Sequence, residues 1–208
     1  MSVSATGTTP PAETVIVFTD GAKNKRGCGA AFWIPGTGES GSERITEGGT
    51  NNVAEFTAVL LALRHLRGVA RRVDVRSDSQ YVINCLTTWF LRWQRNGWKT
   101  ASGSPVKNKD LIQRILALHE EFEGVTYRHV RAHTGSGDPD AVNNDIVDKL
   151  AVATASGEVF DPATAARMTA APRSPHPVTL IGDRLRAERR AELTEQERET
   201  LRGLLGAL

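Results

Sequence analysis

Four acidic residues occupy positions where a carboxylate is hard to explain structurally. Asp20 and Asp78 each end an apolar run, and Glu55 and Asp148 each lie near the start of a predicted helix. If the fold brings these side chains together, they form a dense negative pocket that requires cations, because like charges at short range repel one another. Hard oxygen ligands suit Mg²⁺ or Mn²⁺, and two such ions support in-line attack on a phosphodiester. The pattern therefore predicts a metal-dependent nuclease.

Each acidic residue also has a simpler interpretation when it is taken alone. Asp20 followed by Gly21 is typical of a turn that ends a strand. Glu55 suits the first turn of a helix, where an acid complements the helix dipole, and Asp78 suits a helix N-cap. The occurrence of all four acids in these settings favours one shared site over separate structural roles.

A second feature is a basic segment rich in tryptophan at residues 89–109, which contains no acidic residue. Aromatic residues interleaved with basic ones suit a surface that follows a phosphate backbone. The alternative is that the tryptophans only pack a helix–loop junction. The residues concerned are Trp89, Trp93 and Trp98 with Arg92, Arg95, Lys99, Lys107 and Lys109.

The bulk composition is that of an ordinary globular protein. The chain has 208 residues, enough for one domain and an appendage, and its net charge is only +2, so affinity for nucleic acid must come from a local patch. Cys28 and Cys85 form no metal-ligand or disulfide pattern, which predicts a cytoplasmic location. Residues 1–12 do not resemble a signal peptide, and no segment is apolar enough to span a membrane.

The order of predicted elements defines the fold class. Hydrophobic periodicity predicts three strands, then a helix, a strand, two helices, a strand and a helix. Strands that alternate with helices after an initial meander favour a mixed five-stranded α/β sheet with helices on both faces. The predicted strands are residues 14–19, 27–34, 43–47, 73–77 and 125–130, and the predicted helices are residues 53–66, 80–94, 110–122 and 144–154.

Composition also divides the chain into four parts. We expect a disordered N-terminus at 1–12, the catalytic domain at 13–158, a Pro/Ala-rich linker at 159–180 and a helical tail at 181–208. The tail carries one apolar stripe, formed by Leu201, Leu204, Leu205 and Leu208. It is expected to pair with a second copy of the chain or to bind another protein, and the alternative is that it folds back on its own domain.

Four motifs resemble those of type I ribonuclease H over residues 14–155. They are Phe18-Thr19-Asp20-Gly21, Thr50-Asn51-Asn52 before Glu55, Ser77-Asp78-Ser79-Gln80-Tyr81-Val82 and Gly97-Trp98-Lys99-Thr100. The resemblance implies a ribonuclease H-like fold and endonucleolytic cleavage of the RNA strand of an RNA–DNA hybrid, with 5′-phosphate ends. It also implies two Mg²⁺ ions, with Mn²⁺ as a substitute.

The resemblance also implies roles for individual residues. Asp20, Glu55, Asp78 and Asp148 fall on the metal-binding carboxylates, and His133 falls on the family's catalytic loop histidine. Asp148 is chosen over its neighbours Asp138, Asp140 and Asp145 because Asp-x-Leu-Ala at 148–151 matches the family motif. The residues implied in substrate binding are Asn51, Asn52, Gln80, Trp89, Lys99, Lys107 and Lys109.

Three segments depart from the family pattern. The glycine-rich loop after the first aspartate is shortened to residues 22–26, and the segment between His133 and Asp148 is longer than usual. The last fifty or so residues have no counterpart in the family. These differences concern contacts with the RNA strand, the placement of the loop histidine and the role of the tail.

Other functions remain open at this point. A strand followed by aspartate also occurs in phosphotransferases with an aspartyl nucleophile, but their second aspartate is replaced here by Ala22. A non-catalytic module that binds hybrids is a second alternative, although such a module would be expected to lack at least one of the four acids. A third is a nuclease of the same fold that acts on another structured nucleic acid.

Overall fold

The computed structural model describes residues 14–131 and 138–170. The expected disordered N-terminus and helical tail both lie outside these residues, as does His133. Five strands are present: β1 (Thr14–Asn24), β2 (Gly27–Ile34), β3 (Glu39–Ile45), β4 (Arg72–Ser77) and β5 (Gly124–His129). The helices are α1 (Asn51–Leu66), α2 (Gln80–Asn84), the π-helical turn η1 (Cys85–Trp89), α3 (Phe90–Arg95), α4 (Lys109–His119), α5 (Pro139–Ser156) and α6 (Pro162–Ala170).

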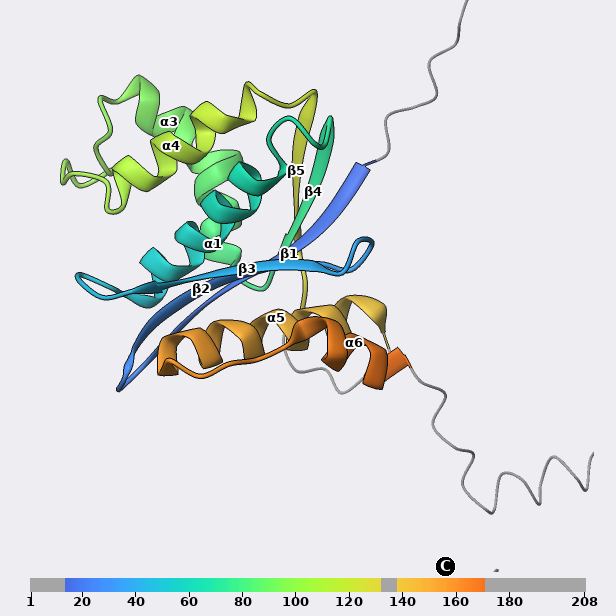
Figure 1. Ribbon diagram of the computed structural model, residues 1–208. Coiled ribbons are helices and arrows are strands. Elements are labelled where there is room, and N and C mark those ends of the chain that lie inside the picture. Colours follow the sequence, from blue (N-terminus) through green and yellow to red (C-terminus); the bar gives the residue numbers. More distant parts are fainter. Residues whose placement is uncertain (1–13, 132–137, 171–208) are drawn as a thin grey trace, which may run out of the picture. The chain divides into compact units, whose positions relative to one another are not determined.

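The strands form one mixed sheet in the order β3-β2-β1-β4-β5. β1, β2 and β3 pair antiparallel as a meander, whereas β1, β4 and β5 pair in parallel. Helices α1 and α5 lie on opposite sides of this sheet (Figure 1). The predicted fold class, a mixed five-stranded sheet flanked by helices, is confirmed.

The sheet separates two hydrophobic cores, because successive side chains of a strand point to opposite faces of the sheet. Val17 and Val75 pack on the side of α1, and Phe18 and Trp33 pack on the side of α5. Each helix is therefore held to the sheet by its own apolar cluster. Within the ranges that the structure covers, no helix has the length and apolar character needed to cross a membrane.

Several boundaries differ from the sequence prediction. β1 continues five residues past the predicted end at residue 19, because its pairing with β2 extends to Asn24 and Gly27. The Asn24 carboxamide accepts from the main-chain N–H groups of Arg26 and Gly27 and closes the hairpin. The shortened segment after Asp20 is thus mostly strand rather than loop. The predicted third strand at 43–47 is instead β3, which begins at Glu39.

The helices also begin and end at residues that periodicity did not predict. α5 starts at Pro139, five residues before the predicted start, because Asp138 is its N-cap and proline fits the first helical position. The predicted helix at 80–94 contains the π-helical turn η1 in its middle. Residues 162–170 of the expected linker form α6, and Ala163 and Ala166 pack against the core on the α5 side. The expectation that a linker begins at residue 159 is therefore wrong for this segment.

Glycine allows a close contact between α5 and the sheet. A Cβ atom built on Gly29 in β2 would lie 2.3 Å from the main-chain oxygen of Ala151 and 2.5 Å from the main-chain nitrogen of Ala155. Main-chain atoms of a packed helix cannot withdraw locally, so this position requires glycine. The distance between α5 and the sheet is set partly at this point.

We predict that Gly29→Ala destabilises the domain by at least about 1–3 kcal/mol, because overpacking displaces the helix backbone. Urea unfolding followed by circular dichroism measures the change. Gly36→Ala is the matched control, since a Cβ there meets nothing within 4 Å. Equal stability of the two variants would contradict this account of the α5 contact.

Candidate active site

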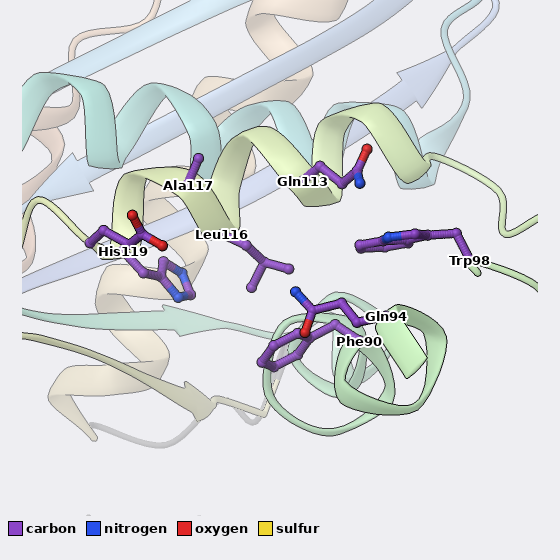
Figure 2. Close-up of a pocket in the computed structure, with 8 residues that line it drawn as sticks. Phe90, Gln94, Trp98, Gln113, Leu116, Ala117 and His119 are labelled. Carbon is purple, nitrogen blue, oxygen red and sulfur yellow. The ribbon is translucent and has the colours of Figure 1, made fainter. Parts of the chain in front are cut away.

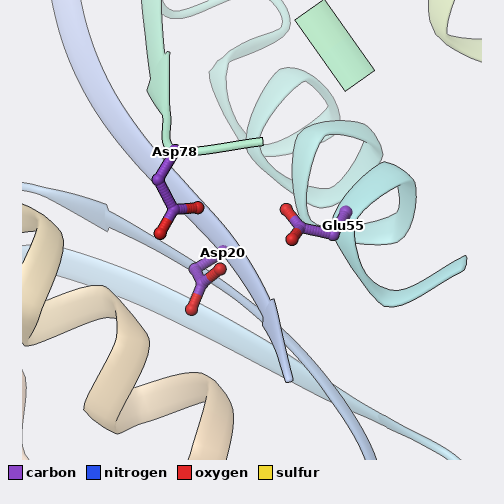
Figure 3. Close-up of side chains that lie close together, drawn as sticks. All are labelled: Asp20, Glu55 and Asp78. Carbon is purple, nitrogen blue, oxygen red and sulfur yellow. The ribbon is translucent and has the colours of Figure 1, made fainter. Parts of the chain in front are cut away.

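Three acidic side chains from different elements converge at one end of β4. Asp20 comes from the middle of β1, Glu55 from the second turn of α1, and Asp78 from the position directly after β4. Each offers a carboxylate oxygen, and these atoms all lie within 4.8 Å of one another. Figure 3 shows the three side chains directed toward a common point. Asp20 and Glu55 are buried, and Asp78 is half-buried.

Strand register and a glycine bring the three together. In the parallel pairing of β1 with β4, Phe18 lies beside Arg76, so Asp20 and Asp78 follow at the same level two residues later. Gly21 lets α1 approach, because a Cβ at this position would lie 2.2 Å from the main-chain nitrogen of Glu55. The cluster is therefore a product of backbone geometry and not of long, adaptable side chains.

Burial and mutual proximity oppose ionisation of the clustered carboxyl groups. The pKa of Asp20 is raised to about 8, mainly by burial and to a smaller extent by the charges of Asp78 and Asp148. The pKa of Glu55 is raised to about 9, mainly by burial and to a smaller extent by the charges of Asp20 and Asp78. Closely spaced carboxylate oxygens that resist ionisation suit a hard divalent cation, which would stabilise their charged forms. The residues present therefore fit a metal site of the Mg²⁺ type.

Asp148 approaches the cluster from α5. It lies close enough to Asp20 for its negative charge to raise the pKa of that carboxyl group. Its competitors have other partners: Asp145 pairs with Lys149 at 2.6 Å, Asp140 pairs with Arg76, and Asp138 caps α5. Among the four acids of this segment, Asp148 is thus the one whose contact with the cluster the structure describes.

Sequence reasoning missed two residues that touch Asp78. Asn144 is 3% exposed, and its Nδ2 donates to Oδ2 of Asp78 at 3.4 Å. Its position four residues before Asp148 on one helix face could have suggested this contact. His129, at the end of β5, forms a hydrogen bond through Nε2 with the main-chain oxygen of Asp78 at 3.1 Å. Nothing in the sequence motif points to His129, because the contact depends on the β4–β5 pairing.

Comparisons with known proteins agree with this geometry. The RNase H family model matches residues 12–156. The chain belongs to the ribonuclease H family. A ribonuclease H of Anaeromyxobacter dehalogenans (strain 2CP-C) is 42% identical over 147 residues, which cover 71% of this chain and 72% of that protein. A ribonuclease H of Nitratidesulfovibrio vulgaris (strain DP4) is 43% identical over 151 residues, which cover 68% and 89%.

A solved structure shows the same fold. The foamy viral protease-reverse transcriptase in complex with an RNA/DNA hybrid superposes with a TM-score of 0.58, over 74% of this chain and 22% of that one. The sequences are 17% identical in this alignment, so the likeness concerns the fold alone. The ribonuclease H-like fold implied by the family resemblance is confirmed.

The polar residues expected to contact substrate in this ribonuclease H domain lie beside the acids. Asn51 and Asn52 are exposed on the first turn of α1, and Nδ2 of Asn51 donates to Oε1 of Glu55 at 3.4 Å. Gln80 is exposed at the first position of α2, where its Nε2 donates to Oδ1 of Asn84 at 3.0 Å. All three side chains are therefore available at the surface near elements that carry the acids.

The tryptophans of the basic segment form a contiguous aromatic row. Ring centroids are 5.8 Å apart for Tyr81 and Trp89, 6.0 Å for Trp89 and Trp93, and 6.5 Å for Trp93 and Trp98. Nζ of Lys109 lies 6.0 Å from the centre of the Trp98 ring, within range of a cation–π interaction. The row supports the interpretation that tryptophans shape this segment.

The basic side chains of the same segment remain available to a partner. Lys99 and Lys107 are exposed, and an isolated β-bridge between Lys99 and Pro105 shapes the loop that carries them. A separate cleft of about 420 Å³ lies between this segment and α4 (Figure 2). It is lined by Phe90, Gln94, Trp98, Gln113, Leu116, Ala117, His119 and Glu120, and includes none of the clustered acids.

The raised pKa values predict how pH acts on the metal-free protein. The ordinary values are 3.8 for Asp20 and 4.5 for Glu55. Because folding raises both pKa values, the folded state binds more protons than the unfolded state at neutral pH. The stability contributed by these bound protons is lost as the pH rises toward about 8–9. In a chelator, we therefore expect the thermal midpoint to fall between about pH 5 and 9, and Glu55→Gln to be more stable than the parent at pH 8 by roughly 1 kcal/mol or more.

Thermal unfolding at a series of pH values, with EDTA and with MgCl₂, tests this expectation. Added Mg²⁺ should restore the stability of the parent at pH 8, since a ligand of the folded state stabilises it. Glu43→Gln, a change at an exposed residue of β3, is the control. A parent protein that is equally stable at pH 5 and pH 8 in EDTA would show that the acids are not held close together.

Proposed function

We propose that this chain is an endonuclease that hydrolyses the RNA strand of RNA–DNA hybrids. The observation that carries the proposal is the convergence of Asp20, Glu55 and Asp78 from three elements of a ribonuclease H fold. Relatives named ribonuclease H that are more than 40% identical support the activity. The foamy viral neighbour that contains an RNA/DNA hybrid supports the choice of substrate.

The acidic residues would hold two Mg²⁺ ions, with Mn²⁺ as a substitute. Asp20, Glu55, Asp78 and Asp148 supply only oxygen ligands, which suit these ions. When bound, the ions supply Lewis acidity that activates a water and neutralises charge on the phosphate. Attack of the water on phosphorus breaks the bond to the 3′-oxygen, so the products carry a 5′-phosphate and a 3′-hydroxyl. His133 is proposed to move a proton in this reaction.

Discrimination for RNA would depend on the 2′-hydroxyl, because this group distinguishes RNA from DNA locally. Asn51, Asn52 and Gln80 can both donate and accept hydrogen bonds, and all three are exposed beside the acidic cluster. We assign to them contacts with the minor groove. Trp89, Lys99, Lys107 and Lys109 would bind the phosphate backbone farther along the hybrid, where charge rather than base identity decides affinity.

We predict that Asp78→Asn folds normally and nearly abolishes hydrolysis, because it removes one ligand charge with little change in volume. Binding of the hybrid should survive, since repulsion of phosphates decreases. Cleavage of matched RNA–DNA, RNA–RNA and DNA–DNA duplexes, together with hybrid affinity from fluorescence anisotropy, measures both effects. Asp145→Asn is the control and should retain full activity.

The outcomes separate the candidate functions. Cleavage of the hybrid alone supports the proposal, and preferential cleavage of another duplex would replace the hybrid as substrate. Tight hybrid binding by a parent protein that cleaves nothing would instead support a binding module. Substantial turnover by Asp78→Asn would remove Asp78 from the metal site.

A further prediction concerns the basic segment. Replacing Lys99, Lys107 and Lys109 by alanine should raise KM more than it lowers kcat, because these groups would bind substrate and transition state alike. The slope of log affinity against log salt should decrease by about one for each phosphate that the variant no longer binds. Arg71→Ala, just before the end of β4 that is remote from Asp78, is the control. A slope that matches the parent would show that this segment does not bind the phosphate backbone.

A further inference from the structure

An ion-pair network joins the first turn of α5 to the strand that leads into Asp78. Arg76 lies in β4, two residues before Asp78, and its Nη1 donates to Oδ1 of Asp140. The same guanidinium donates through Nε and Nη2 to Oδ2 of Asp74, at 3.2 and 3.1 Å. One side chain thus links a central strand to a helix residue 64 positions later in the sequence.

The guanidinium has little freedom to move. The side chains of Arg76 and Asp74 are 13% and 11% exposed, and Cζ of Arg76 lies 5.6 Å from the centre of the buried Phe18 ring. Asp74 also accepts from the hydroxyl of Thr126 at 3.3 Å. A planar fork that is held by an aromatic ring and two carboxylates has one preferred orientation. The position of Asp140 is therefore tied to β1 and β4 together.

Asp140 is the first of three residues that follow one another along a single helix face. Asp140, Asn144 and Asp148 are spaced by four residues, which places them one above the other on α5. The second and third lie at the acidic cluster: Asn144 donates to Asp78, and Asp148 is close enough to Asp20 for its charge to act on that carboxyl group. Figure 1 shows α5 below the sheet that contains β1 and β4. Movement of the first turn would therefore displace both contacts.

We propose that Arg76 and Asp140 are positioning residues for the metal centre. Their ion pair fixes the position of α5 along its axis and its rotation relative to β4. In this position Asn144 donates to Asp78 and Asp148 lies near Asp20. The inference rests on the proposed function, because it concerns the same site. The alternative is that Arg76 only neutralises the buried Asp74, in which case removal of the ion pair with Asp140 would lower stability and leave metal binding unchanged.

The test compares Asp140→Asn with Asp145→Asn, which removes an ion pair from the same helix at an exposed position. Two measurements are made on the full chain: the shift of the thermal midpoint on adding MgCl₂ without nucleic acid, and the Mg²⁺ concentration for half-maximal hydrolysis. We expect Asp140→Asn to require about 10-fold more Mg²⁺, with the KM for the hybrid unchanged. Asp145→Asn should match the parent, and Asp140→Glu should restore the requirement for Mg²⁺ toward that of the parent.

A double variant shows whether the two residues act through each other. If they do, Arg76→Gln combined with Asp140→Asn should require no more Mg²⁺ than whichever single variant requires the higher Mg²⁺ concentration. Additive effects, or a folded Asp140→Asn with the parent's Mg²⁺ requirement, would overturn the proposal. Arg76→Lys keeps the positive charge but removes the planar guanidinium, and it provides the same test if Asp140→Asn does not fold. An Arg76→Lys variant with the parent's Mg²⁺ requirement would also overturn the proposal. A parent protein with no response to Mg²⁺ in either measurement contradicts the proposed function itself.

Discussion

Repulsion among the carboxylates of Asp20, Glu55 and Asp78 is the constraint on which the rest of this domain depends. Burial makes each charge more costly and strengthens its effect on the others, which is why the pKa values of Asp20 and Glu55 are raised. Without a cation, these three side chains would separate if their backbones could move. The arrangement therefore requires elements whose backbones cannot move apart, and a bound divalent ion would stabilise it.

The two hydrophobic cores supply that rigidity. α1 packs on one face of the sheet and α5 on the other, and each brings part of the site: α1 brings Glu55, and α5 brings Asn144 and Asp148. Gly21 and Gly29 allow both helices to contact strand backbones directly. Because packed interiors resist small displacements, apolar contacts on both faces of the sheet help to hold the acids together.

Charge outside the cluster serves a different purpose. The cluster attracts cations and repels phosphates, so a nucleic-acid substrate needs favourable contacts elsewhere. The exposed Lys99 and Lys107 lie on a segment that an aromatic row shapes, so the proposed phosphate-binding residues belong to other elements than the clustered acids. The Arg76 network is a third use of charge, in which a guanidinium that is largely shielded from solvent joins β4 to α5.

Local pattern in the sequence was enough to predict the element order, the sheet type and the acids Asp20, Glu55 and Asp78, because periodicity and strand-end position are properties of short segments. Such patterns did not predict that β1 continues through Asp20, since this depends on pairing with β2, or that residues 162–170 form a helix. They also gave no sign of the contact of Arg76 with Asp140, whose partners are 64 residues apart, or of the contact of His129 with the main chain of Asp78. Only the tertiary structure decides these contacts, because strand register and helix packing determine which distant side chains meet.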